Sequence, residues 1–114
     1  MLAQGVMAPH PAPHIHPLIA RAIEELRLLR LLYKGKERIV EPHDYGIQNG
    51  VVKLLAYQVG GVSSGRLPAW RSLHESLISD MEILDRTFAG GRDAPSGKHQ
   101  KWDQLFLRVK PRKK

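Results

Sequence analysis

The spacing of apolar residues changes once along this 114-residue chain, and that change limits the folds open to it. From Leu18 to Leu26 apolar side chains recur every three or four positions with charged residues between them, as in an amphipathic helix. Pro17 suits the first turn of such a helix. Further along, apolar residues alternate with polar ones, as in strands that bury one face. The pattern predicts one helix over residues 17–28, followed by a sheet.

Glycine-containing turns divide the alternating region into short strands. The turns are Lys34-Gly35-Lys36 and Gln48-Asn49-Gly50, and Asn49-Gly50 is a strong hairpin signal. The predicted strands span residues 30–33, 38–45, 51–59, 69–74 and 76–84, with a short final strand near 105–109. Loops rich in glycine and serine lie between them at 60–68 and 89–104.

One helix and five short, mostly sequential strands indicate an α+β domain. The most economical arrangement is an N-terminal helix that caps a strongly bent antiparallel sheet or small barrel, because closure removes exposed strand edges. This domain spans residues 18–88, after a flexible lead-in rich in proline and histidine at 1–17. A linker loop at 89–104 leads to the final strand and a basic tail at 105–114.

Positive charge is concentrated toward the end of the chain. The net charge is +7, and eight of the 18 Lys and Arg residues lie at or after Arg92, against two of the 11 Asp and Glu residues. Clustered cations bind phosphate backbones without sequence preference. The weak candidate nucleic-acid site comprises Lys110, Arg112, Lys113 and Lys114. The simpler alternative is a solvated, disordered terminus.

Composition excludes several classes of protein. The chain has no cysteine, which excludes a disulfide framework, a thiolate zinc site and a cysteine nucleophile. No segment approaches the roughly 20 apolar residues of a membrane span, and the first residues lack a signal-peptide pattern. We therefore expect a soluble, cytoplasmic protein with no membrane partner. A chain of this length holds one domain, so separate cofactor and substrate domains are excluded, and we expect no cofactor.

The segment RIVEPHDYG, residues 38–46, gathers the side chains best suited to chemistry. In a regular strand Glu41 and His43 share one face and Asp44 lies on the other, although Pro42 marks an edge, a bulge or a bend. A metal needs a third converging ligand, and no spacing fixes His74 in that role. No nucleophile or acid–base pair has the spacing that catalysis requires. We predict neither a metal site nor an enzyme, and a hydrogen-bonded structural role for His43.

The chain resembles the WYL domain family, bacterial ligand-sensing modules usually found in transcription regulators, over about residues 18–88. The resemblance lies in three successive stretches, RLLYKGKERIVEPHDYG, VVKLLAYQVGG and WRSLHESLISDMEILDRTF. The matching residues are Tyr33, Gly35 and Arg38 of an opening Y-x-G-x-x-R motif, Pro42 and His43 of a P-H step, Ala56 and Tyr57, Arg71 of an R-x-F motif, and Leu84 and Phe88 of a closing L-D-x-x-F motif. The family's Trp-Tyr-Leu triplet aligns with Val52-Lys53-Leu54, and Leu73 replaces the phenylalanine after Arg71.

The resemblance implies an Sm-like barrel of five strands preceded by a helix, with a basic and polar ligand pocket. The positions that match this pocket are Arg38, His43 and Arg71, and Tyr57 is suited to stack on a base. Guanidinium groups hold phosphate bidentately, so the implied ligand is a nucleotide or single-stranded nucleic acid. The chain is then expected to be a stand-alone, non-catalytic sensing module with a regulatory role and without a DNA-reading helix-turn-helix of its own.

Each of these residues also has a purely structural interpretation. Salt bridges would join Arg38 to Glu41 or Glu37, and Arg71 to Glu75 or Asp80. Tyr57, like Trp70, would be a core or rim residue. The alternative function is a protein-interaction module that docks a partner protein, with the loop at 60–68 as its contact. A regulator protein partner and a homo-oligomer both remain open.

Overall fold

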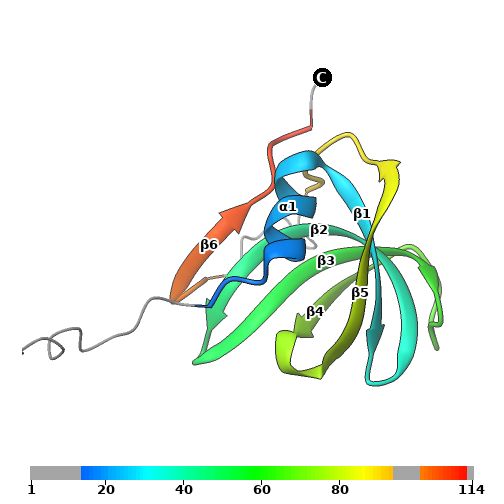
Figure 1. The fold of residues 1–114 in the computed structure, drawn as a ribbon, viewed down its shortest axis with the longest axis horizontal. Coiled ribbons are helices and arrows are strands. Elements are labelled where there is room, and N and C mark those ends of the chain that lie inside the picture. Colours follow the sequence, from blue (N-terminus) through cyan, green and yellow to red (C-terminus); the bar gives the residue numbers. More distant parts are fainter. Residues whose placement is uncertain (1–13, 94–100, 113–114) are drawn as a thin grey trace, which may run out of the picture.

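The computed structural model describes residues 14–93 and 101–112, and in these ranges one helix is followed by an antiparallel sheet (Figure 1). The elements are α1 (Pro17–Glu25), β1 (Arg27–Tyr33), β2 (Lys36–Gln48), β3 (Val51–Gly61), β4 (Ala69–His74), the 3-10 turn η2 (Glu75–Leu77), β5 (Ile78–Thr87) and β6 (Gln104–Arg108). The α+β class is confirmed. Most of the predicted lead-in, at 1–13, and part of the predicted linker, at 94–100, lie outside the described residues.

The helix begins where the sequence predicts and ends earlier. His16 caps it, because its Nδ1 accepts a hydrogen bond of 3.1 Å from the Leu18 amide, and Pro17 occupies the first turn. Leu26 adopts a left-handed conformation with φ 57°, which reverses the chain after Glu25. The prediction of a helix to residue 28 is therefore too long, and Leu28 is buried within β1 instead.

Two tight hairpins set the order of the first three strands. Lys34-Gly35 and Asn49-Gly50 have positive φ at both central residues, as two-residue turns between right-twisted strands require. The sheet runs β4-β3-β2-β1-β5, and all of these neighbours pair antiparallel. β4 and β5 thus lie at the two ends of this order, although only η2 separates them along the chain. The sheet is strongly curved as a result, but no ladder joins β4 to β5 in the described residues, so it is not closed there.

β2 is long enough to pair with two strands, one after the other, along the same edge. Its first part pairs with β1, from Tyr33↔Lys36 to Leu29↔Val40. Its second part pairs with β6, from Asp44↔Arg108 to Ile47↔Gln104. β3 occupies the opposite edge along nearly the whole strand. β6 therefore extends the sheet where β1 has ended, and α1 lies between these two strands (Figure 1).

The concave side of the curved sheet, here called the inner face, carries the hydrophobic core. Along β1 and β3, residues that point to this face alternate with residues that point away from it, so one face is buried. The buried cluster comprises Ile19, Ala22 and Ile23 of α1 with Leu29, Leu31, Tyr33, Val40, Tyr45, Leu54, Ala56, Leu73 and Val109. The helix thus covers part of the inner face, and the opposite side of the sheet is called the outer face.

Candidate functional site

The four residues predicted to bind a ligand lie on two faces of the sheet. Cross-strand partners share a face. Arg38 pairs with Leu31, and Arg71 pairs with Ala56; both partners belong to the core, so both arginines are on the inner face. Tyr57 pairs with Trp70 on the outer face, and the imidazole of His43 contacts that same indole at 4.7 Å between ring centroids. The structure therefore brings Arg38 and Arg71 together and separates them from His43 and Tyr57.

The Arg38 side chain lies on the inner face, and its Nε atom has no hydrogen-bond partner in the described residues. That atom is buried, and no partner for it is present in residues 14–93 and 101–112. The guanidinium carbon lies 5.1 Å from the centre of the Tyr33 ring, in a cation–π contact. Burial, together with the nearby charge of Arg71, lowers the pKa of Arg38. The environment of Arg38 therefore disfavours the positive charge of its guanidinium group.

Arg71 is held in place by neutral groups. Its Nε donates to Gln58 Oε1 at 2.9 Å, and its Nη2 donates to Ser63 Oγ at 2.7 Å. Gln58 is fully buried, and its amide nitrogen donates to the carbonyls of Gly60 and Val62, which fixes the orientation of its oxygen. Arg71 is therefore well oriented while its positive charge is not neutralised.

The salt bridges that the structural interpretation assigned to these two arginines are not formed. Each candidate carboxylate contacts another group: Glu41 pairs with Arg92, Glu37 and Asp80 with Arg30, and Glu75 accepts a hydrogen bond from Tyr45. Arg38 and Arg71 have no carboxylate within salt-bridge distance in the part of the chain that the structure describes. The two positive charges therefore share the inner face without a counter-ion from the described residues.

On the outer face, a β-bulge in β2 determines where His43 lies. The register shifts between Pro42↔Ala56 and Asp44↔Leu55, so His43 is the extra residue of β2. Pro42 thus marks a bulge, one of the three possibilities open from the sequence. Because of the bulge, Asp44 lies on the outer face and Tyr45 on the inner face, opposite to the alternation expected for a regular strand.

Both ring nitrogens of His43 are engaged by backbone groups. Nδ1 lies 2.9 Å from the Glu41 carbonyl oxygen, and Nε2 accepts a hydrogen bond of 3.1 Å from the Arg92 amide. The Nδ1 nitrogen therefore carries the proton, and the imidazole is neutral. Burial lowers the pKa of His43, even though the Glu41 carbonyl and nearby carboxylates favour the charged form. The ring also stacks on Phe88 at 5.7 Å, and its contacts are those of a structural histidine.

This neutral His43 predicts a pH dependence of stability. The folded-state pKa is below the ordinary value of 6.5, so the unfolded chain takes up a proton at higher pH than the folded protein does. The contribution of His43 is complete above about pH 7 and is lost as the pH falls from about 6.5 toward the folded-state pKa. We expect His43→Gln to flatten the free energy of unfolding between pH 7.5 and 5.5 relative to wild type, measured by urea titration. Parallel curves for wild type and His43→Gln would contradict the assignment.

Next to His43, an ion pair between the buried Glu41 and the partly exposed Arg92 holds residues 88–93 against the sheet. The Arg92 guanidinium binds Glu41 with two hydrogen bonds of 2.7 and 3.1 Å, and Glu41 is only 5% exposed. The same guanidinium lies 4.3 Å from the centre of the Tyr57 ring. Tyr57 also contacts Trp70 edge-to-face at 5.2 Å. Tyr57 therefore supports Arg92 and lies on the face opposite to Arg38 and Arg71.

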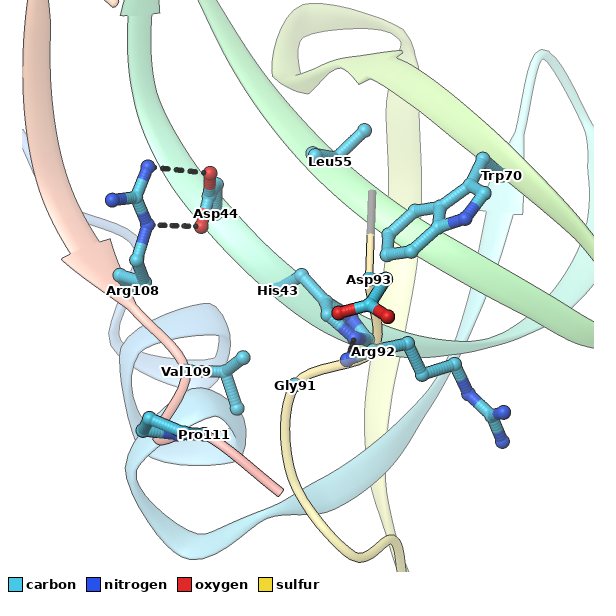
Figure 2. Close-up of a pocket in the computed structure, with 10 residues that line it drawn as sticks. All are labelled: His43, Asp44, Leu55, Trp70, Gly91, Arg92, Asp93, Arg108, Val109 and Pro111. Atoms are coloured by element: carbon cyan, nitrogen blue, oxygen red, sulfur yellow. Dashed lines mark hydrogen bonds and ion pairs between the residues drawn. The ribbon is translucent and has the colours of Figure 1, made fainter. Parts of the chain in front are cut away.

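Asp44 joins β6 to this outer surface. It accepts two hydrogen bonds of 3.0 Å from Arg108 and one of 3.3 Å from the Trp102 indole. The backbone amide of Val109 donates to the His43 carbonyl. A pocket of about 530 Å³ opens between these groups (Figure 2). Its lining residues are His43, Asp44, Leu55, Trp70, Gly91, Arg92, Asp93, Arg108, Val109 and Pro111.

The described part of the basic tail forms hydrogen bonds with the backbone of the same region. The Lys110 carbonyl accepts from the Gly91 amide at 2.7 Å, and Arg112 donates to the Gly90 carbonyl at 3.2 Å. The Lys110 side chain is exposed. Lys113 and Lys114 lie outside the described residues. Within residues 14–93 and 101–112 no three His, Asp or Glu side chains are grouped to hold a metal, and no helix is long and apolar enough to cross a membrane.

No protein-family model, curated protein or solved structure matches this chain. The site residues that the sequence did not indicate are Gln58, which orients Arg71, and Arg92, which neutralises Glu41. Gln58 is the one polar residue between apolar positions in AYQV, which is a usable signal for a buried polar contact. Arg92 lies in a loop by composition, and nothing in its spacing indicates Glu41 as its partner.

Proposed function

We propose that this chain is a non-catalytic binding module of WYL type that takes a phosphate-bearing ligand, a nucleotide or single-stranded nucleic acid, at Arg38 and Arg71. The observation that carries the proposal is that two arginines share the inner face, near enough for the charge of Arg71 to lower the pKa of Arg38, with no carboxylate partner in the described residues. A ligand phosphate would supply the missing counter-charge and would satisfy the buried Nε of Arg38.

The surroundings of the arginine pair agree with this proposal. Tyr33 lies under Arg38, and Gln58 and Ser63 hold Arg71 through Nε and one Nη atom. Its second Nη atom has no hydrogen-bond partner among the described residues and could donate to a ligand. We extend the proposal to the architecture: the curved sheet and its helix correspond to the Sm-like small barrel of WYL domains, with a regulatory role for the bound ligand. The role of His43 and Tyr57 in this proposal is to support the sheet from the outer face.

Fluorescence anisotropy with a labelled single-stranded oligonucleotide, in competition with ATP, tests the proposal. We expect Arg38→Met and Arg71→Met each to lower affinity by about 10- to 100-fold, since a hydrogen bond to a charged group contributes about 1.5–3 kcal/mol. Arg86→Met is the matched control, because Arg86 is an exposed arginine of β5. Equal affinity for the Arg38→Met/Arg71→Met double variant and wild type would refute the proposal.

The thermal stability of the same variants separates a binding role from a structural one. An uncompensated charge in a partly buried position costs stability. Arg38→Met should therefore unfold at the wild-type temperature or above it. A marked loss of stability would indicate that Arg38 is a structural residue.

A separate variant isolates the tail. In Lys110→Gln/Lys113→Gln/Lys114→Gln the backbone contact between Lys110 and Gly91 is retained, whereas a deletion would remove it. Affinity that disappears in this variant and with salt, and that does not respond to Arg38 or Arg71, would indicate non-specific phosphate binding by the tail. It would also favour the alternative function, a protein-interaction module.

A further inference from the structure

The outer-face pocket has the size and lining of a small-molecule site. Its volume of about 530 Å³ falls in the range of about 300–1,000 Å³ that ligand pockets occupy. Its apolar lining comes from β3, β4 and the segment after β6, through Leu55, Trp70, Val109 and Pro111. Of its lining residues only Val109 belongs to the buried cluster, and neither Arg38 nor Arg71 lines it, so it is separate from the anion site proposed above.

Most charges around this pocket are already neutralised within the protein. Arg108 is paired with Asp44 through two hydrogen bonds, and Arg92 is paired with Glu41. In Figure 2 the Arg92 guanidinium points away from the pocket, and the Arg108 guanidinium is turned to Asp44. His43 is neutral, because both of its nitrogens are engaged and burial lowers its pKa. These groups therefore offer little net charge to a ligand.

Asp93 is the exception among the lining residues. It is exposed, and no hydrogen bond or ion pair joins it to any group in the described ranges 14–93 and 101–112. Asp93 lines this pocket together with Trp70 and His43, and Figure 2 draws it beside these two residues. Arg112 lines an adjoining pocket of about 410 Å³ together with Asp93, and it donates to the Gly90 carbonyl.

We infer that this pocket binds a small organic cation: a protonated amine with an apolar, preferably aromatic, body. The amine would pair with the Asp93 carboxylate, and an ammonium near the Trp70 indole would gain a cation–π contact. The apolar body would be removed from water against Leu55, Val109 and Pro111. A carboxylate ligand would instead be repelled by Asp93.

Three probes of similar size and shape test this inference by NMR titration of the ¹⁵N-labelled protein. They are 2-phenylethylamine, 2-phenylethanol and 3-phenylpropionate, which carry a positive, no and a negative charge at pH 7. The readout is the Trp70 indole N–H signal, which a Trp70→Phe variant distinguishes from that of Trp102. We expect the amine to bind with a Kd on the order of millimolar, as its size allows, and about fivefold more tightly than the alcohol.

Asp93→Asn is the decisive variant. It should reduce the affinity for the amine to that for the alcohol and leave the affinity for the alcohol unchanged. Asp85→Asn, on β5, is the matched control, because it removes the same charge from a fully exposed aspartate away from the pocket. Equal affinities for amine and alcohol, wild-type amine binding in Asp93→Asn, or no shift of the Trp70 signal with any probe would each overturn the inference. The Arg38→Met/Arg71→Met variant should bind the amine as wild type does, so this site and the anion site can fail separately.

Discussion

Replacement of Arg92 by methionine is expected to lower the free energy of unfolding by about 1.5–3 kcal/mol, the range for hydrogen bonds to a charged group. This is less than the cost of breaking a fully buried ion pair, because the Arg92 side chain is 37% exposed. The loss arises because Glu41, only 5% exposed, would keep a charge with no counter-ion. Arg92 also contacts the Tyr57 ring, and its backbone amide bonds to His43. The substitution should therefore loosen residues 88–93 from the sheet. Urea denaturation followed by circular dichroism measures the loss.

Two further variants show whether the cost comes from the unpaired carboxylate. Glu41→Leu/Arg92→Met removes both charges and should recover most of the lost stability, because apolar replacement of a buried pair is often neutral. Arg21→Ala breaks the Arg21–Glu25 pair of α1, in which both side chains are well exposed, and should cost less than about 1 kcal/mol. A double variant as unstable as Arg92→Met would show that packing, not charge, accounts for the loss.

Gly61→Ala is expected to destabilise the protein by about 2–5 kcal/mol through backbone strain and steric overlap. Gly61 has φ +86°, a conformation that alanine adopts with difficulty. A Cβ atom there would also lie 2.7 Å from the Arg38 Cα and would overlap the Glu37 carbonyl oxygen. Relief of this overlap requires β2 and β3 to separate at the position of Arg38. The variant should therefore weaken anion binding as well as stability.

Gly65→Ala is the control for Gly61→Ala, since both glycines lie in or beside the connection from β3 to β4. A Cβ atom at Gly65 would have no heavy atom of the described residues within 4 Å, and the φ of Gly65 is not positive. The change should therefore be neutral or stabilising by up to about 1 kcal/mol. Differential scanning fluorimetry on the two variants gives the comparison. Similar melting temperatures for both would contradict the strain at Gly61.

Local patterns were sufficient to predict the elements of the fold. The helix start at Pro17, the two hairpin turns and β4 follow from residue types that act over a few positions. Element ends were less accurate, because they depend on contacts far along the chain. β1 begins at Arg27, three residues before the predicted start at residue 30. The Arg27 guanidinium there donates a hydrogen bond to the Leu84 carbonyl on β5. β5 likewise extends to Thr87, which pairs with Arg27.

The candidate site was harder to predict, because alternation alone assigns faces only in regular strands. The bulge after Pro42 exchanges the faces of Asp44 and Tyr45, and the sequence indicates a break at Pro42 without its geometry. The sequence also did not predict which residues pair with the carboxylates. Glu41 bonds to an arginine 51 positions away, whereas sequence reasoning offered it the nearby Arg38. Glu41 pairs across the strands with Tyr57 on the outer face, whereas Arg38 lies on the inner face, so the two residues do not meet.

The double use of one edge of β2 has a consequence for the order of folding. The β1–β2 and β2–β3 hairpins close within a few residues, whereas β6 must find Asp44 across 64 positions of chain, so its docking carries a much larger loop-closure entropy. Until β6 has docked, the backbone of Asp44–Ile47 is an unpaired strand edge. Unpaired edges can form hydrogen bonds with strands of other molecules. The Asp44 contacts with Arg108 and Trp102 thus favour the chain's own strand over a foreign one, which protects the growing sheet against aggregation.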